Sequence, residues 1–187
     1  MTARFLALLA ALPLIAPLAL SAPALAGHDD PAQTLVMETN KGTIRIRLMH
    51  DMAPKHAERL KTLSQEGFYD GVVFHRVLAG FMAQTGDPTG TGTGGSSYPD
   101  LKAEFSAMPF KRGTIGMARS QSPNSANSQF FIVYERSDWL DGKYTVVGQV
   151  VEGMDVADAL KKGERANNGM VKNPDKIVRM RLASDTQ

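Results

Sequence analysis

Apolar and polar side chains alternate along one stretch in the first third of the chain. Ile44, Ile46 and Leu48 are each separated by one polar residue, and this period of two predicts a strand with one buried face. Turn-forming residues at 40–42 precede this strand, so residues 34–50 predict a β-hairpin. Further strand patterns, separated by turn-rich segments, occur at 72–77, 81–87, 113–119, 128–134, 144–151 and 176–183.

Residues 54–67 change to a helical period. Ala57, Leu60 and Leu63 form one apolar stripe, with a proline in the first turn and a glycine at the stop. A second helix is predicted at 154–162. Eight short strands with a helix near each end of the strand series predict a mainly β protein, a closed eight-stranded antiparallel β-barrel capped by two α-helices. An open α+β sheet is the alternative.

The N-terminal residues 1–26 have a different character. A long apolar run ends in the small-x-small pattern that precedes signal-peptidase cleavage, with Ala26 as its last residue. A transmembrane anchor is the competing interpretation, but Pro13 and Pro17 interrupt the run and leave it short for a bilayer. We therefore expect a cleavable signal peptide, export, and a mature single domain at 27–187 with no stable membrane association.

Composition removes several classes of function. The formal net charge is only +2, so nothing favours nucleic acid as a partner, because phosphate binding requires a basic excess. The chain has no cysteine, which excludes thiol catalysis and thiolate metal sites. Its four histidines lack the spacing of metal ligands. We expect neither a metal nor another cofactor.

A glycine-rich segment at 90–95, GTGTGG, formally matches the dinucleotide-binding pattern G-x-G-x-x-G. That motif needs a helix at its end, where the phosphate binds. Turn-forming residues follow here instead, so we interpret the segment as a loop whose backbone can approach another group closely. Serine hydrolysis is also disfavoured, because G-x-S-x-G is absent from the sequence.

Two of the predicted strands carry an amide beside a large apolar group. Alternation places Met82 and Gln84 on one face of their strand, and Gln129 and Phe131 on one face of another. A single buried glutamine is usually a structural amide with hydrogen-bond partners. Two of them, with Arg76 close in sequence, favour an apolar groove lined by polar groups.

Together these segments resemble the cyclophilins, a family of peptidyl-prolyl cis–trans isomerases. The resemblance rests on FHRVLAGFMAQTGD, the GTGTGG loop, GTIGMARS, NSQFFIVY and WLDGKYTVVGQVVEGMDV, and it covers almost all of residues 33–183. The family has an eight-stranded antiparallel barrel with two helices. The segment MARSQSPNSANSQFF resembles the sequences of the bacterial branch of the family. Together with the signal peptide, this resemblance implies that the protein is located in the periplasm.

The resemblance implies a site, position by position. The catalytic arginine falls on Arg76, supported by Gln84. Tyr144 stands where many eukaryotic members have a histidine, Arg119 replaces a common asparagine, and Thr85 follows Gln84 where glycine is usual. The substrate-binding positions that the resemblance implies are Phe81, Met82, Gly92, Ala118, Arg119, Ser120, Gln129, Phe131, Trp139, Leu140 and Tyr144.

The reaction that the resemblance implies explains why no nucleophile is present. Twisting a peptide bond breaks its resonance but no covalent bond, so one fixed positive donor and a dry apolar pocket are sufficient. We expect His75 to face away from Arg76, and Phe81 to reach the pocket only if the chain bends at Gly80. Expected partners are proline-containing polypeptides and cyclosporin, with the protein a monomer. A proline-peptide-binding chaperone with little catalysis is the alternative, and a structural barrel is a third.

Overall fold

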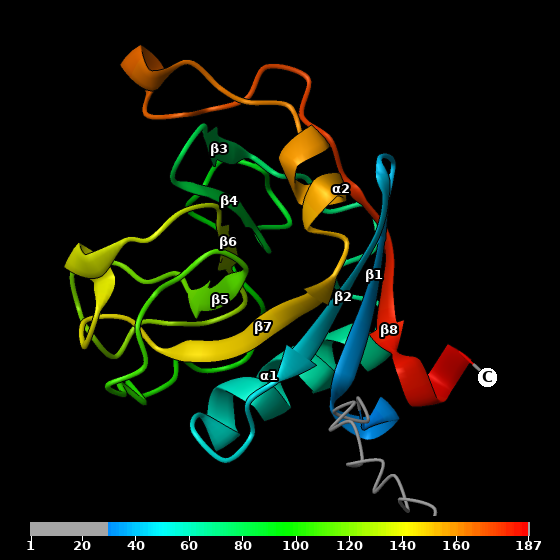
Figure 1. The fold of residues 1–187 in the computed structure, drawn as a ribbon. Coiled ribbons are helices and arrows are strands. Elements are labelled where there is room, and N and C mark those ends of the chain that lie inside the picture. The colour runs from blue at the N-terminus through cyan, green and yellow to red at the C-terminus, as the bar shows by residue number, and fades with distance from the viewer. Residues whose placement is uncertain (1–29, 187) are drawn as a thin grey trace, which may run out of the picture.

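A computed structural model describes residues 30–186, so the expected signal peptide at 1–26 lies outside the described residues. Eight antiparallel strands form one sheet in the order β3-β4-β6-β5-β7-β2-β1-β8, and the sheet curls strongly on itself (Figure 1). The strands are β1 (Thr34–Thr39), β2 (Gly42–Leu48), β3 (Arg76–Leu78), β4 (Met82–Thr85), β5 (Thr114–Met117), β6 (Phe130–Val133), β7 (Val146–Glu152) and β8 (Ile177–Leu182).

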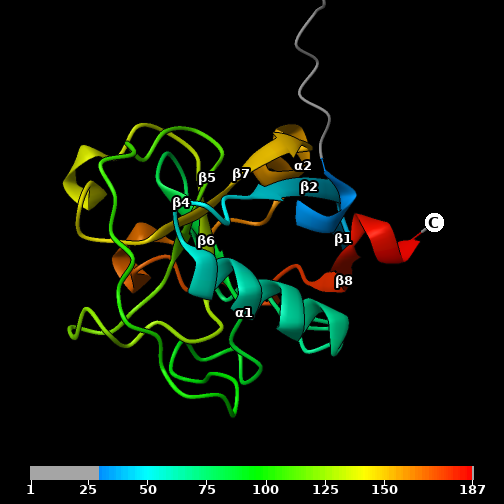
Figure 2. The same cartoon turned by 90° about the horizontal axis from the view of Figure 1, so that it is seen from below.

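Within residues 30–186, two α-helices accompany the sheet, as predicted. The first, α1 (Pro54–Gln65), packs against β8 and β7 and runs across the lower side of the curled sheet (Figure 2). The second, α2 (Met154–Ala159), packs against β2 and is shorter than the predicted 154–162, because Leu160 is already extended at ψ 137°. Single 3-10 turns lie at Pro31–Gln33, Asp138–Leu140, Arg165–Asn167 and Ala183–Thr186.

The prediction of a closed barrel is wrong in one respect: the described sheet is an open half-barrel. No ladder joins its edge strands β3 and β8 among residues 30–186. Instead, two isolated bridges, Val73 to Lys176 and Arg76 to Met170, connect the two sides. The segment before β8 is irregular, with Asn168 and Asn173 both at φ 53°, and a left-handed backbone cannot continue a regular ladder. Strand number and antiparallel pairing are as predicted.

Buried apolar side chains form two clusters. The larger one fills the space between the sheet and α1 and includes the alternating residues of the β1–β2 hairpin. The smaller one lies beneath the candidate site and consists of Met82, Phe110, Phe131, Val133, Leu140 and Val146. The floor of the site is therefore part of a packed core, which holds its side chains in fixed rotamers.

Candidate active site

The central feature is a cross-strand pair on β3 and β4. Arg76 stands directly opposite Gln84 in the antiparallel register, and Arg76 Nη1 donates to Gln84 Oε1 at 3.1 Å. Gln84 in turn stands opposite Phe131 of β6. The pleat thus brings a cation, an amide and an aromatic ring to one face of three neighbouring strands, as the period-two alternation predicts.

A chain of amides extends this pair toward the glycine-rich loop. Gln84 Nε2 donates to Gln129 Oε1 at 2.8 Å. Gln129 Nε2 donates to the carbonyls of Gly92 at 3.1 Å and Gly94 at 2.8 Å. Each donation fixes which end of the amide faces its neighbour, so Gln84 must present its oxygen to Arg76. Both glutamines have hydrogen-bond partners, and their amides link Arg76 to the glycine-rich loop.

Asp87, whose role was not predicted from the sequence, holds the glycine-rich loop in place. Its carboxylate accepts from the backbone N–H groups of Thr89 at 2.7 Å, Thr91 at 3.1 Å and Gly92 at 2.6 Å. Burial alone would raise the pKa of this carboxyl, but the hydrogen bonds from Thr89, Gly94 and Gly92 outweigh it and lower the pKa to about 2. An aspartate followed by a proline, as at 87–88, favours turn initiation, so the local sequence contained this information.

A pocket of about 100 Å³ opens beside Arg76. Its aromatic floor depends on Gly116, where a Cβ would lie 2.3 Å from the Phe131 ring. The ring is also fixed by Phe110 and Tyr144, each with a centroid 5.9 Å away. All nine lining residues belong to the predicted set: Arg76, Phe81, Met82, Gln84, Ala118, Arg119, Phe131, Leu140 and Tyr144.

The bend expected before Phe81 is present and brings this residue to the pocket. Gly80 has φ 72°, a left-handed conformation that glycine adopts without steric cost. Phe81 therefore lines the pocket with Met82, although the two residues are adjacent in sequence. Trp139 lies outside the residues that line the pocket, with its ring 5.5 Å from that of Phe81 and 53% of its surface exposed. This is a rim position.

A wider hollow of about 560 Å³ adjoins the pocket and shares Gln84, Ala118 and Arg119 with it. The two hollows therefore form one continuous groove. The wider part contains the remaining predicted positions, Gly92, Ser120 and Gln129. It is also lined by residues that the sequence analysis did not identify: Thr93, Gly94, Gly95, Ser96, Asp100, Ser125 and Asn127.

Arg119, which replaces the common asparagine, contacts Tyr144 and Lys143. Its Cζ lies 4.4 Å above the ring of Tyr144, a cation–π geometry. Its Nε and Nη2 donate to the carbonyl of Lys143 at 3.0 and 2.9 Å. The side chain is folded onto the pocket wall, so it shapes this wall together with Tyr144.

The electrostatics of the site centre on Arg76. Burial lowers the pKa of its guanidinium from the usual value, although Tyr144 acts in the opposite direction, and an arginine remains charged at neutral pH. Arg76 also donates to Asn168, another residue that the sequence analysis did not identify. His75 is buried and lies against Gly92 rather than in the pocket, which agrees with its expected orientation.

Within residues 30–186, no three histidine, aspartate or glutamate side chains gather in a way that suits a metal ion. None of the helices described there is long and apolar enough to span a bilayer.

Comparison with known proteins agrees with this fold and site. Residues 34–182 match the family model for "Cyclophilin type peptidyl-prolyl cis-trans isomerase/CLD". The chain therefore belongs to the cyclophilin family of peptidyl-prolyl cis–trans isomerases, and the family and enzyme class implied by the sequence resemblance are confirmed.

Relatives and solved structures support the same assignment. A probable peptidyl-prolyl cis-trans isomerase from Brucella suis is 52% identical over 181 residues, covering 91% of this chain and 92% of the relative. Cyclophilin AquaCyp293 from Hirschia baltica matches with a TM-score of 0.75 at 29% identity, covering 83% of this chain and 76% of that one. A cyclophilin type isomerase from Cryptosporidium parvum, crystallised in the presence of the dipeptide Ala-Pro, has a TM-score of 0.74 at 29% identity, covering 80% and 98%.

Proposed function

We propose that this chain accelerates cis–trans isomerisation of X-Pro bonds by using Arg76 to stabilise the twisted amide. The observation that carries the proposal is the position of the guanidinium, which lines a pocket of about 100 Å³ beside the apolar side chains of Phe131 and Met82 and is hydrogen-bonded to Gln84. The pocket is of a size to take a prolyl ring. A charged donor at the edge of such a pocket has no function in simple ring binding.

The chemistry of the amide explains this choice of residues. Rotation about a peptide bond costs ~18–20 kcal/mol because resonance is lost. In the twisted state the prolyl nitrogen becomes pyramidal and regains a lone pair, to which Arg76 donates a hydrogen bond. In the planar ground state this lone pair is delocalised, so the interaction favours the transition state selectively. No proton is transferred, which agrees with a site built without a nucleophile.

The size of the required rate acceleration indicates that the arginine does not act alone. Uncatalysed isomerisation takes roughly 10–100 s, and a turnover on the order of 10³ s⁻¹ requires a barrier lower by about 5.5–7 kcal/mol. One charge-assisted hydrogen bond in a dry site supplies about 3 kcal/mol. The remainder comes from anchoring the ring against Phe131 and Met82 and from excluding water that stabilises the planar amide.

The substrates we propose are proline-containing segments of exported proteins in the periplasm. The signal-peptide pattern ending at Ala26 supports this location. A cyclophilin type isomerase of similar fold, crystallised in the presence of Ala-Pro, supports the substrate class. We further propose that the protein acts as a monomer and that cyclosporin binds the same groove, with Trp139 at its rim.

A proline-binding chaperone that uses the same groove without useful catalysis is the competing function. Two measurements on the wild-type protein separate the two functions. Exchange NMR on a short peptide with an Ala-Pro bond measures the rate of interconversion, and a titration of the same peptide measures binding. We expect catalysis at substoichiometric protein. Binding without any increase in the exchange rate would establish the chaperone function instead.

A further inference from the structure

The contacts of the Arg76 guanidinium include a residue that lies 92 positions further along the chain. Arg76 Nε donates to the backbone oxygen of Asn168 at 2.9 Å, and Arg76 Nη2 donates to Asn168 Oδ1 at 3.0 Å. Gln84 accepts only from Nη1. Arginine has five N–H groups, so two residues hold three of them. One hydrogen on each terminal nitrogen remains without an acceptor among residues 30–186 and is available to a substrate.

The backbone around Asn168 is built to make these contacts. Asn168 has φ 53°, a left-handed conformation that asparagine adopts more readily than most residues. Gly169 follows and packs so closely on Leu78 that a Cβ there would lie 2.6 Å from Leu78 Cγ. The carbonyl of Gly169 also accepts from Val77 N at 2.8 Å. The segment is thereby fixed to β3, the strand in which Arg76 lies.

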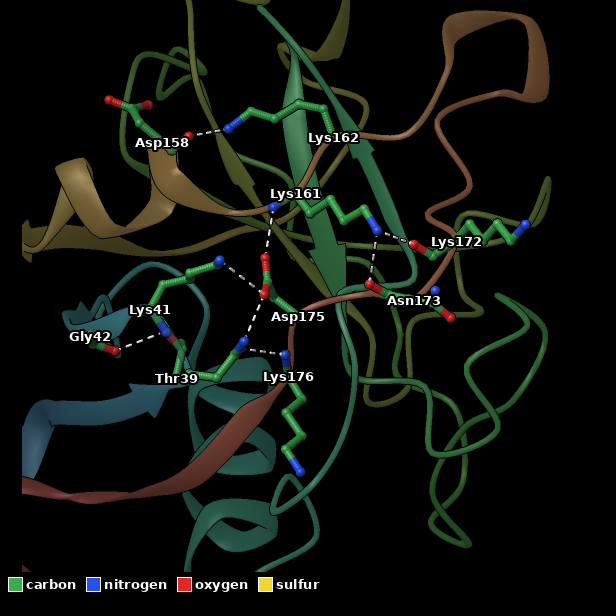
Figure 3. Close-up of polar contacts among 11 residues, drawn as sticks. Thr39, Lys41, Gly42, Asp158, Lys161, Lys162, Lys172, Asn173, Asp175 and Lys176 are labelled. Carbon is green, nitrogen blue, oxygen red and sulfur yellow. Dashed lines mark hydrogen bonds and ion pairs between the residues drawn. The ribbon is translucent and has the colours of Figure 1, made fainter.

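The buried carboxylate of Asp175 joins the two ends of the same segment (Figure 3). Asp175 accepts from the backbone N–H of Lys161 at 2.8 Å and from Asn40 Nδ2 at 2.6 Å. At the same time, Lys161 Nζ donates to the carbonyl of Lys172 at 2.6 Å. The two ends of the 161–176 loop are thus joined to each other and to the β1–β2 turn, so Asn168 is carried on a preorganised loop.

We infer that Asn168 is a positioning residue for Arg76, and that the 161–176 loop serves to present it. This inference rests on the proposed function of Arg76. With Gln84 as its only partner, the guanidinium could rotate about its Cδ–Nε bond. The two Asn168 contacts fix the plane of the guanidinium, so that a free N–H faces the pocket. Catalysis is sensitive to such placement, since a displacement of about 1 Å can cost roughly 100-fold in rate.

The test compares two substitutions of the same kind in one loop. Asn168→Gly keeps the left-handed backbone and the carbonyl that binds Nε, but removes Oδ1 from Nη2. Asn173→Gly is the matched control, because Asn173 has the same φ of 53° and donates or accepts nothing at Arg76. We expect Asn168→Gly to lower kcat about tenfold with KM changed less than about twofold, because the ring pocket is untouched. We expect Asn173→Gly to leave both constants unchanged.

Arg76→Ala, measured alongside, separates the proposed function of Arg76 from the inference about Asn168. If Arg76→Ala is as active as the wild type, the proposed function is wrong. If Arg76→Ala loses activity while Asn168→Gly keeps the wild-type kcat, only the inference about Asn168 is overturned. Equal losses in Asn168→Gly and Asn173→Gly would also overturn it, since they would indicate a general role in loop stability. A slower kcat in Asn168→Gly alone, with less protected Arg76 Nη2–H in ¹⁵N NMR, supports it.

Discussion

Arg76 and Gln84 face each other across the β3–β4 pair, with Arg76 Nη1 3.1 Å from Gln84 Oε1. The relationship depends on register, because a slip of one residue would turn one of the two side chains to the opposite face. The register is fixed by the bend at Gly80 and by the pairing of β4 with β6. The short β3–β4 hairpin thereby sets the orientation of the charged guanidinium on which the proposed chemistry depends.

Removing the amide of Gln84 tests this relationship. Gln84→Ala leaves Nη1 of Arg76 without its acceptor and Gln129 without its donor. We expect kcat to fall about tenfold through misplacement of the guanidinium, with little change in the free energy of unfolding. Gln65→Ala, at an exposed glutamine near the end of α1, is the control and should leave kcat unchanged. An unaffected kcat in Gln84→Ala would show that the amide chain does not orient Arg76.

The aromatic floor of the pocket permits a comparison of two stacked phenylalanines. Phe131 lines the pocket, whereas Phe110 is fully buried behind it, with centroids 5.9 Å apart. We expect Phe131→Leu and Phe110→Leu each to cost about 1 kcal/mol of folding free energy, as buried hydrophobic exchanges of similar volume do. Only Phe131→Leu should raise KM. Equal KM values in the two variants would contradict the assignment of Phe131 to ring binding.

Trp139 provides an optical signal for binding. It is the sole tryptophan of the chain, is 53% exposed and lies 5.5 Å from Phe81. A proline peptide that contacts Phe81 should change the environment of this indole, so we expect a saturable change in its fluorescence. Trp139→Phe should abolish the signal and retain isomerase activity. A peptide that binds by calorimetry without changing the fluorescence would place the binding site elsewhere.

The lowered pKa of Asp87 predicts that the free energy of unfolding decreases in acid. Its pKa is lowered from 3.8 to about 2 in the folded protein, so the folded state binds its proton less readily than the unfolded state. This stabilisation is complete above about pH 4 and is lost as the pH falls toward 2. It corresponds to about 2 kcal/mol, since one pKa unit is about 1.4 kcal/mol.

Denaturant titrations of the wild type and Asp87→Asn at several pH values isolate this contribution. The difference in unfolding free energy between the two proteins should be largest at pH 5 and should shrink toward pH 2, because only the wild type loses the ionised carboxylate. A difference that stays constant across this range would mean that the Asp87 carboxylate does not hold the glycine-rich loop through its charge.

Local patterns in the sequence were sufficient to predict part of this site. Alternation placed Met82 and Gln84 on one face, and the glycine at 80 allowed a bend. The contact with Asn168 could not be predicted, because it joins positions far apart in sequence through an irregular loop. The same irregularity explains why the prediction of a closed barrel was wrong. Strand patterns indicate the number of strands, but the missing β3–β8 ladder depends on the left-handed backbone at Asn168 and Asn173.

The central claim is that the Arg76 guanidinium lowers the barrier to twisting the prolyl amide. The most direct test is exchange NMR on an Ala-Pro peptide with wild-type protein and Arg76→Ala, with circular dichroism to establish that both are folded. We expect kcat/KM to fall about 100-fold in Arg76→Ala, the effect of removing one preorganised charged donor, while peptide affinity changes little. Turnover by Arg76→Ala at the wild-type rate would contradict the account.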